Sequence, residues 1–530
     1  MNVINDKWLF VTYLDGHSEQ ISVRQAFIDA DKIKSLDTPT FHNKKAYLYD
    51  VPVMQFLSVL LLSAYFKPET DFEAGGKYFS QKLMKKGWNK KIILDYLDKW
   101  AYKFDVFDEQ FPFLQDTTLK ESADNYAKKD KKNTYILNIN PLAPGAANNI
   151  FENNPTKDTS VIENFAMDNT ELVYALLYHN SMGMTICPGT YCGQALLNSI
   201  RMFILLQGNN LKETIIYNTL PLRNSTKPDE YSTEALYDKP IWEFDNPDDI
   251  MQYGEKLGNN HLACSFFPSQ PIYIKAEDGK IVGGVFGDKT EHCVIDKDSR
   301  LLLERVYFEE NPYAVKNVNP KDNTLTKYNW TKDLKVSGLC TEITKKTDFS
   351  LCNIISDTQQ YNHDAKCFIY YRDIVFKSSI NILCGFGKYD EIPQHVFDLL
   401  QSPNYNKIAE IYQIAVDRYR YYMTKLADTK EVKNVAKFKV DEMTSKFSQS
   451  AEVYFLQTLV KECDTCTEEE IINNFLKFLY KTAITLINGV VNTPYVTSPI
   501  NYAKSVREYN GRTKKVNAKC LSLWEEFANG

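Results

Sequence analysis

The chain has 530 residues, of which 44% are hydrophobic and 13% are aromatic. This composition supplies enough apolar side chains for a packed core and excludes an intrinsically disordered chain. The formal net charge of −6 excludes a globally basic nucleic-acid-binding protein, so contacts with a polyanion must come from local clusters of lysine and arginine.

The first part of the chain mixes strand and helix patterns. Residues 8–14 are aromatic and β-branched, Asp15-Gly16 supplies a turn and residues 20–23 return, which predicts a β-hairpin. Helical patterns follow at residues 51–66, 89–104 and 169–182. The polar stretches between and after them predict long loops, at residues 117–154 and 223–260.

Strand patterns dominate residues 271–388. Asp278-Gly279 separates PIYIKAE from KIVGGVF, which predicts a second hairpin. Residues 368–376 and 380–384 predict further strands.

The character changes after Pro393, where four long helical patterns follow each other with short connections, at residues 404–426, 447–463, 468–488 and 499–517. Thr467 and Glu470 form a capping box, and Gly489 lies where the third of these helices is expected to stop. That helix has one apolar stripe: Ile471, Ile472, Phe475, Leu476, Leu479, Ala483 and Ile487.

These patterns predict an α+β fold in two domains. A large mixed N-terminal globular domain spans residues 1–392, and a C-terminal antiparallel four-helix bundle spans residues 393–530.

Cysteine spacing and hydropathy indicate a soluble cytoplasmic protein. The eleven cysteines have no regular spacing, as is typical of reduced thiols. The CxxC pair Cys463–Cys466 has no second pair beside it, so we expect no zinc site. The most apolar run, residues 51–66, contains three polar residues and falls short of the roughly 20 residues of a membrane span.

Motifs for catalysis are missing from the sequence. It has no GxxxxGK[ST], GxGxxG, GxSxG or HExxH motif. The dipeptide His363-Asp364 matches one element of HD-type metal-dependent nucleases and phosphohydrolases, but it falls between strand patterns, where a polar hairpin tip is favoured. We therefore expect a binding protein without cofactor, metal or catalytic residues, with an HD-type enzyme as the alternative and a helical scaffold without a DNA role as a third hypothesis.

Two basic runs stand out in this acidic chain. Residues 82–103 hold seven lysines against Asp95 and Asp98. The second run has Glu508 as its acidic residue and consists of Lys504, Arg507, Arg512, Lys514, Lys515 and Lys519. Each run is either a solvated helix face or a surface for a polyanion.

Three unusual segments occur in a fixed order: NVINDKWLFV at residues 2–11, WAYKFDVFDEQFPFLQ at residues 100–115, and LKETIIYNTLPL at residues 211–222. Pro240-Ile241-Trp242 follows them, and LINGVVNTPY lies at residues 486–495. Together they resemble the CasA family, the large subunit of the type I-E CRISPR surveillance complex Cascade. Phe10 stands where that family usually has proline.

The resemblance implies a non-catalytic role in RNA-guided DNA recognition. CasA proteins scan duplex DNA for a short protospacer-adjacent motif, help to open the helix there, and recruit a helicase–nuclease in trans. The expected partners are double-stranded target DNA, that helicase–nuclease, and the guide-RNA-bound Cascade subunits (backbone, 5′-handle-binding and small). Scanning requires weak phosphate contacts, and the degenerate code of the minor groove allows several motifs to be read.

The resemblance also implies site residues. The DNA wedge, a glutamine at a hairpin tip inserted between base steps, corresponds to Gln359 or Gln360. The loop near the 5′ end of the guide is Phe151, Glu152, Asn153 and Asn154. The glycine loop corresponds to Gly183, Gly189 and Gly193, and the basic finger in the minor groove to Arg305. The expected contacts to the DNA backbone are Lys504, Arg507, Arg512, Lys514 and Lys515.

Each assignment has a plainer alternative. The wedge residues can form an exposed polar turn, and residues 151–154 an ordinary surface loop. Arg305 can be an arginine at the edge of the core, paired with Glu304 or Glu309.

Overall fold

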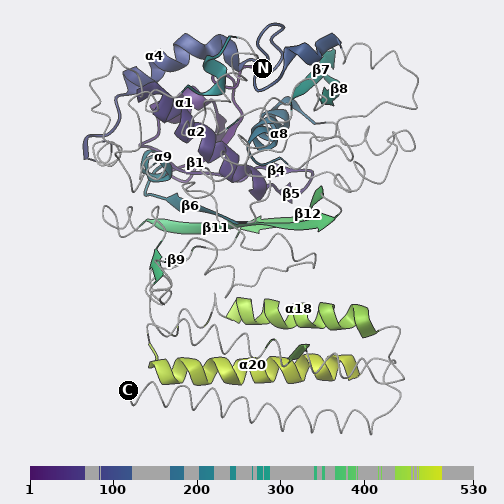
Figure 1. Cartoon of the computed structure of the whole chain (residues 1–530). Helices are drawn as coiled ribbons and strands as arrows, with labels where there is room; N and C mark the ends of the chain where they lie inside the picture. Colours follow the sequence, from purple (N-terminus) through teal and green to yellow (C-terminus); the bar gives the residue numbers. More distant parts are fainter. Residues whose placement is uncertain are drawn as a thin grey trace. The chain divides into compact units, whose positions relative to one another are not determined.

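The computed structural model describes residues 1–65, 83, 85–121, 167–183, 202–219, 239–245, 266, 271–277, 280–286, 340–342, 349–351, 365–377, 380–388, 391, 416, 419–420, 436–454, 458, 462 and 465–491 (Figure 1). The chain separates into two compact units. The first comprises Met1–Leu325 and Cys352–Glu391, and the second comprises Thr326–Leu351 and Ile392–Gly530. The sequence-based domains, residues 1–392 and 393–530, stay a prediction.

The first unit begins with the predicted hairpin. Strands β1 (Leu9–Tyr13) and β2 (Ser18–Ile21) pair antiparallel, and β3 (Ile33–Leu36) pairs with the other edge of β1. Gly16 occupies the turn with a φ of +92°, a conformation that glycine adopts without strain. Ser22 ends the hairpin, because its side chain accepts a hydrogen bond from Gln25 N (3.1 Å) and so caps α1 (Val23–Ile28), a helix that the sequence patterns did not indicate.

Helix α2 (Asp50–Tyr65) is the centre of the first unit. Every residue from Val51 to Tyr65 is buried, which explains why the helix is apolar on all sides. In the described part of the chain, it contacts helices α4 (Lys90–Trp100), α8 (Asn169–Met182) and α9 (Leu211–Thr219). These elements confirm the helices predicted at residues 51–66 and 169–182; the one predicted at 89–104 is α4 followed by a 3₁₀ turn at Ala101–Phe104.

Hydropathy alone would mark part of this core as a membrane span. Among the described residues, the stretch Tyr47–Tyr65, a 3₁₀ turn (Tyr47–Tyr49) followed by α2, is long and apolar enough, but 89% of its apolar window is buried inside the protein. Such burial is typical of a core helix.

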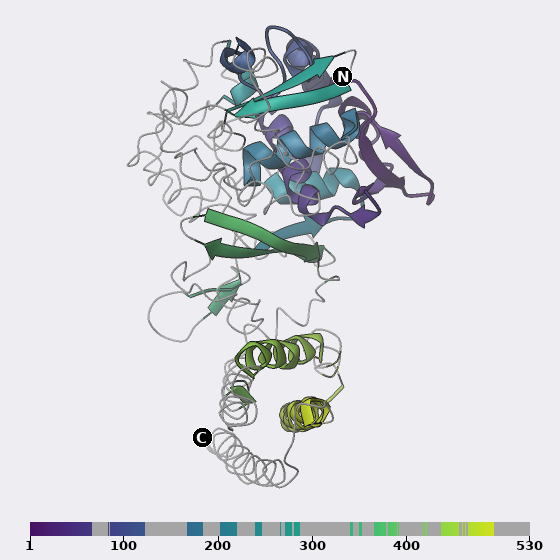
Figure 2. The same cartoon turned by 90° about the vertical axis from the view of Figure 1, so that its right-hand side faces the viewer.

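A second sheet of the first unit joins distant parts of the sequence. Its order is β12-β11-β6, formed by β6 (Met202–Gln207), β11 (Lys366–Lys377) and β12 (Ile380–Lys388), all antiparallel (Figures 1 and 2). Strands β11 and β12 confirm the predicted strands at residues 368–376 and 380–384. The sequence patterns did not indicate β6.

Two further hairpins complete the described sheets of this unit. Strands β7 (Ile272–Glu277) and β8 (Lys280–Phe286) pair around Asp278-Gly279, as predicted. Strands β4 (Thr40–Phe41) and β5 (Lys44–Lys45) are joined by His42 and Asn43, whose φ values of 50° and 62° suit a two-residue turn. Short 3₁₀ turns lie at Thr117–Leu119 and Ile241–Glu243.

The second unit contains helices α18 (Ala436–Tyr454) and α20 (Glu468–Val491), which contact each other, and a small hairpin of β9 (Cys340–Glu342) and β10 (Phe349–Leu351). The capping box before α20 is confirmed, because Thr467 N donates to Glu470 Oε2 (2.9 Å) and Glu470 N donates to Thr467 Oγ1 (3.4 Å). The apolar stripe is buried at Ile471, Ile472, Phe475, Leu476, Leu479 and Ala483.

Two expectations about the C-terminal helices change, and a third stays a prediction. Gly489 does not end α20, which continues to Val491, since a glycine within a helix costs only about 1 kcal/mol relative to alanine. Helix α18 begins at Ala436, well before the predicted residue 447. The helices predicted at 404–426 and 499–517 fall largely outside the described residues, so the structure confirms a mixed α/β fold and leaves the four-helix bundle a prediction.

Candidate functional site

One residue of the predicted site, Gly183, lies in the described part of the chain. The others, like His363-Asp364 of the alternative hypothesis, lie outside it: Phe151, Glu152, Asn153, Asn154, Gly189, Gly193, Arg305, Gln359, Gln360, Lys504, Arg507, Arg512, Lys514 and Lys515.

Gly183 is buried and ends α8 as its C-cap residue. Its φ of −57° is open to any residue, so the backbone angle does not demand glycine. The space does, because a Cβ at this position would lie 2.5 Å from the carbonyl oxygen of His179 and 2.9 Å from its Cα. The first residue of the predicted glycine loop is therefore a glycine because the chain leaves the helix in close contact with its last turn.

Arg372 in β11 holds the same helix end. Its Nη1 donates to the carbonyl oxygen of Met182 (2.7 Å) and to the Tyr178 hydroxyl (3.2 Å), and the guanidinium lies 5.3 Å from the centre of the Phe203 ring. Arg372 is 2% exposed, and this burial lowers its pKa. A cation at a helix C-terminus is stabilising, so Arg372 ties the start of the predicted loop to the central strand of the β12-β11-β6 sheet. Sequence reasoning missed Arg372; an arginine inside an apolar strand pattern was the available signal.

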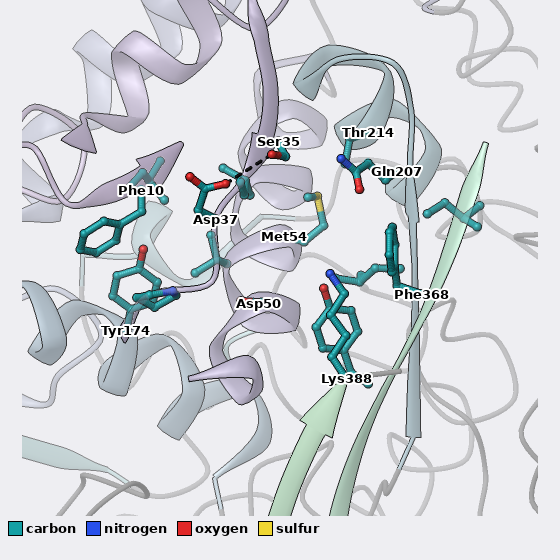
Figure 3. Close-up of a pocket in the computed structure, with 17 residues that line it drawn as sticks. Phe10, Ser35, Asp37, Asp50, Met54, Tyr174, Gln207, Thr214, Phe368 and Lys388 are labelled. Carbon is teal, nitrogen blue, oxygen red and sulfur yellow. Dashed lines mark hydrogen bonds between the residues drawn. The ribbon is translucent and has the colours of Figure 1, made fainter. Parts of the chain in front are cut away.

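A cavity of about 60 Å³ lies beside this sheet, lined by residues of β1, β3, α2, α8, β6, α9, β11 and β12 (Figure 3). At about 15 Å³ for each bound water, it has room for roughly four. Its wall is mostly apolar, and its charged side chains are Asp37, Asp50 and Lys388.

Asp50 begins α2 and faces this cavity (Figure 3). Burial raises its pKa to about 6, although the hydrogen bond from Thr38 Oγ1 (2.6 Å), the charge of Lys388 and a hydrogen bond with Tyr370 act in the opposite direction. The ammonium group of Lys388 lies 4.0 Å from the centre of the Phe368 ring and 5.2 Å from that of Tyr370. The Asp50 carboxyl, at the start of α2, therefore interacts with Tyr370 of β11 and with Lys388 of β12.

Asp37 lines the other side of the cavity and accepts hydrogen bonds from Thr12 Oγ1 (2.6 Å) and Ser35 Oγ (3.3 Å) (Figure 3). Within the residues that the structure describes, no group of three or more histidine, cysteine or acidic side chains is placed to hold a metal ion. Asp37 and Asp50 of the cavity make hydrogen bonds to Thr12 and Thr38.

The lysine run at residues 82–103 is not one surface. Lys103 is buried at 4% exposure and donates to the Phe244 carbonyl (3.0 Å) and to Asp245 Oδ1 (2.9 Å), with its ammonium 3.3 Å from the centre of the Phe111 ring. It stabilises the fold and is not available to a polyanion. Exposed lysines of the run are Lys85, Lys86, Lys90, Lys91 and Lys99.

The first two unusual sequence segments meet in the structure. Asn2 Nδ2 donates to the Ala101 carbonyl (2.7 Å), and Val3 N donates to the Phe104 carbonyl (2.8 Å). Trp8, which is fully buried, donates through its indole to the Val3 carbonyl (2.6 Å). These residues fix the opening of the chain against the end of α4.

The end of the second segment and the later Pro240-Ile241-Trp242 are also fixed by hydrogen bonds. Gln115 Nε2 donates to the Val106 carbonyl (2.7 Å), while its Oε1 accepts from Ile274 N (2.8 Å). The indole of Trp242 donates to the Tyr96 hydroxyl (2.8 Å), which donates to Glu243 (2.7 Å). Three of the segments that carry the resemblance, at residues 2–11, 100–115 and 240–242, are therefore tied to distant parts of the fold.

The sequence model of the family described as "CRISPR-associated protein Cse1" matches residues 2–329. The chain belongs to the Cse1 family. The match begins with the Asn2 segment and contains Gly183 and Arg305, whereas Gln359, Gln360 and Arg372 follow its end. The resemblance to CasA is thereby confirmed.

Solved Cse1 structures share the fold. CasA (Cse1) of Thermus thermophilus superposes with a TM-score of 0.62 at 13% identity, over 98% of this chain and 99% of its own. Cse1 of Thermobifida fusca gives 0.61 at 13% identity, over 97% and 98%. A chain of a structure described as "CRISPR RNA-guided surveillance complex" gives 0.60 at 13% identity, over 97% and 99%. No curated protein matches the chain.

Proposed function

We propose that this Cse1 chain is the large, non-catalytic subunit of an RNA-guided CRISPR surveillance complex of type I-E. In that role it recognises a protospacer-adjacent motif in duplex DNA, helps to unwind the target and recruits a helicase–nuclease. The family match over residues 2–329 carries the proposal. The fold similarity to a chain of a surveillance complex supports it.

The proposed division of labour follows the order of the chain. Residues 1–392 dock on DNA and the guide-bound subunits, and residues 393–530 form a four-helix bundle. Residues 151–154 lie near the 5′ end of the guide, Arg305 enters the minor groove, and Gln359 or Gln360 acts as the wedge. Backbone contacts come from the basic run that begins at Lys504. Opening costs on the order of 1.4 kcal/mol per stacked step, which pairing with the guide repays.

The described geometry supports the glycine loop of this proposal. Gly183 and the carbonyl of Met182, held by Arg372 at 2.7 Å, give residues 184–193 a rigid starting point. A loop that starts from a fixed point loses less conformational entropy when it binds, so the anchor increases affinity. Binding residues are commonly carried on loops that a rigid scaffold positions.

The test is a complex reconstituted from this chain, the guide RNA and the other subunits of its system. Duplex DNA with 2-aminopurine beside the motif reports opening by fluorescence. We expect the variant Gln359→Ala/Gln360→Ala to assemble as the wild type does and to open the duplex at least tenfold more slowly. Asn362→Ala, in the same segment, is the matched control. If the double variant opens the duplex as the wild type does, the wedge assignment is wrong. If the wild-type chain does not join the complex, the proposed function is wrong.

The alternative of an HD-type nuclease is tested with the same protein. We expect no cleavage when the purified chain is incubated with duplex DNA and Mn²⁺. Metal-dependent cleavage that His363→Ala abolishes would instead establish the enzyme.

A further inference from the structure

Six lysines gather where three segments of the first unit meet: the turn after α1, the residues before and within the first turn of α4, and the first turn of α9. We call them the lysine patch, which consists of Lys32, Lys85, Lys86, Lys90, Lys91 and Lys212. Helix α1 contacts α4, and α9 contacts β3, so the segments are neighbours in space (Figure 1).

Asp31 organises the centre of the patch. Its Oδ1 lies 2.9 Å from the ammonium of Lys212, and its Oδ2 lies 3.6 Å from that of Lys90. Lys90 also donates to the carbonyl of Ile28, and Lys212 N donates to the carbonyl of Ala30 (3.2 Å). One carboxylate thus holds two ammonium groups side by side.

Gly87 brings the segment before α4 against the same group. Its φ is +71°, and a Cβ there would lie 3.0 Å from the ammonium nitrogen of Lys212, so that group sits directly beside the turn that carries Lys85 and Lys86. Trp88 packs edge-on against Phe27 with their ring centres 5.5 Å apart. The backbone of the patch is therefore anchored in the core, and its lysines project from a fixed surface.

The charges of the patch are not balanced. Asp29 pairs with Lys32 (2.7 Å) and Asp31 with Lys90 and Lys212, and Glu213 follows Lys212 in the first turn of α9, so six lysines and three acidic residues leave three positive charges in a chain of net charge −6. Among the described residues, Lys85, Lys86 and Lys91 have no ion-pair partner. Lys90 and Lys91 also occupy the first turn of α4, where the helix dipole disfavours cations and where no acidic residue lies. The stability of α4 therefore does not account for lysines at these two positions.

We propose that the lysine patch binds the phosphate backbone of duplex DNA, as a contact additional to the loops and wedge assigned above. The choice of DNA over another polyanion rests on the proposed function. Lysine ammonium groups are point charges that contact phosphates without reading bases, so the contact is independent of sequence and weakens steeply with salt.

The experiment measures fluorescence anisotropy of a labelled duplex with the full-length chain, in KCl from 50 to 200 mM. Lys86→Ala/Lys91→Ala removes two lysines that hold no ion pair. We expect weaker binding and a slope of log Kd against log salt reduced by up to about 1.8, or about 0.9 for each lost phosphate contact. Lys7→Ala/Lys44→Ala, which removes two exposed lysines elsewhere on the same unit, is the control and is expected to match the wild type. Thermal unfolding confirms that both variants are folded.

Three outcomes overturn the patch: a Kd and slope equal to those of the wild type, an equal loss in the control pair, or a loss of binding to poly-glutamate with DNA binding unchanged, which would point to an acidic protein partner. The proposed function is tested separately by assembly with the guide RNA. A chain that assembles and opens DNA but shows no patch effect refutes the patch alone, whereas a patch effect without assembly refutes the function alone.

Discussion

Asp50 is a carboxyl group whose ionisation works against folding. Its ordinary pKa is 3.8, and burial raises the value in the folded chain to about 6. As the pH rises from 3.8 towards 6, the unfolded chain releases this proton before the folded chain does, so the unfolded state is stabilised relative to the folded state and the free energy of unfolding falls. The penalty is absent below about pH 3.8 and complete above about pH 6.

Replacing Asp50 by asparagine should remove this pH dependence. Asparagine keeps an oxygen that can accept from Thr38, and it has no charge to desolvate. Relative to the wild type, the free energy of unfolding of Asp50→Asn should rise by about 2 kcal/mol between pH 4.5 and pH 7.5. Urea unfolding at both values measures the difference.

Asp15 offers a control of opposite sign. Its pKa is lowered, chiefly by the hydrogen bond from the backbone of His17 and then by the bond to its side chain. Asp15→Asn should therefore lose stability relative to the wild type as the pH rises. A difference between Asp50→Asn and the wild type that does not vary with pH would contradict the assignment.

A single helical side chain completes the edge of the β12-β11-β6 sheet. Asn218 in α9 is fully buried, and its Nδ2 donates to the carbonyls of Leu206 and Thr214, both at 2.7 Å. Its Oδ1 accepts from Leu206 N (3.1 Å). Among the described strands, β6 lies at the edge of this sheet, so the amide of Asn218 takes the place of a neighbouring strand beside Leu206.

Asn218→Ala should lower the free energy of unfolding by about 2–4 kcal/mol, because it leaves a buried N–H and a buried C=O of Leu206 without partners. Asn210→Ala, immediately before the same helix, is the matched control. It removes a cap, the bond from Glu213 N to Asn210 Oδ1 (3.0 Å), and should cost only about 1 kcal/mol. Equal losses for the two variants in urea unfolding would show that Asn218 does not complete the sheet.

Elements whose signals are local were predictable from the sequence. Helix α8 begins and ends where expected because Asp168 caps its first turn (2.7 Å to Glu171 N) and Gly183 follows its end. The dipeptide Asp278-Gly279 between two strand patterns predicted the hairpin β7–β8. By contrast, the sequence patterns did not predict the hairpin β4–β5. Its turn residues His42 and Asn43 have positive φ values although neither is a glycine.

The candidate site was harder to predict because distant residues compose it. Strand β6 pairs with β11, which lies far along the chain, so no local pattern indicates the pairing. The bond of Arg372 to Met182 and the effect of Lys388 on Asp50 likewise join residues that lie far apart in the sequence. The segments that resembled CasA include buried residues, such as Trp8 and Trp242, whose hydrogen bonds fix parts of this fold.

At the scale of the whole molecule, the chain enters the second unit at residue 326, returns to the first at 352 and re-enters the second at 392. Each unit has its own buried residues, so we expect two unfolding transitions in calorimetry rather than one. Gly183→Ala should lower the free energy of unfolding of the first unit by about 1–3 kcal/mol, because the added methyl group overpacks the helix end, and so should lower the temperature of that unit's transition. Thr467→Ala should lower the free energy of unfolding of the second unit by about 1 kcal/mol, because it removes the N-cap of α20, and so should lower the temperature of the second unit's transition.

The double variant Gly183→Ala/Thr467→Ala provides the control. Sites in separate units should act additively, within about 0.5 kcal/mol. If both single variants move the same transition, the two units unfold as one and the division at residues 326, 352 and 392 has no energetic meaning.

The pairing of Met202–Gln207 with Lys366–Tyr371 also has a consequence during translation, because the two strands are synthesised at different times. The hairpin β1–β2 closes within the first 21 residues, but β6 leaves the ribosome long before the strand that will cover it. At a translation rate of about 5–20 residues per second, β6 is without its partner strand β11 for roughly 10–30 s. Asn218 arrives early enough to shield one side of that nascent strand, so its other side is where a chaperone, or a second copy of the chain on the same messenger, would make first contact.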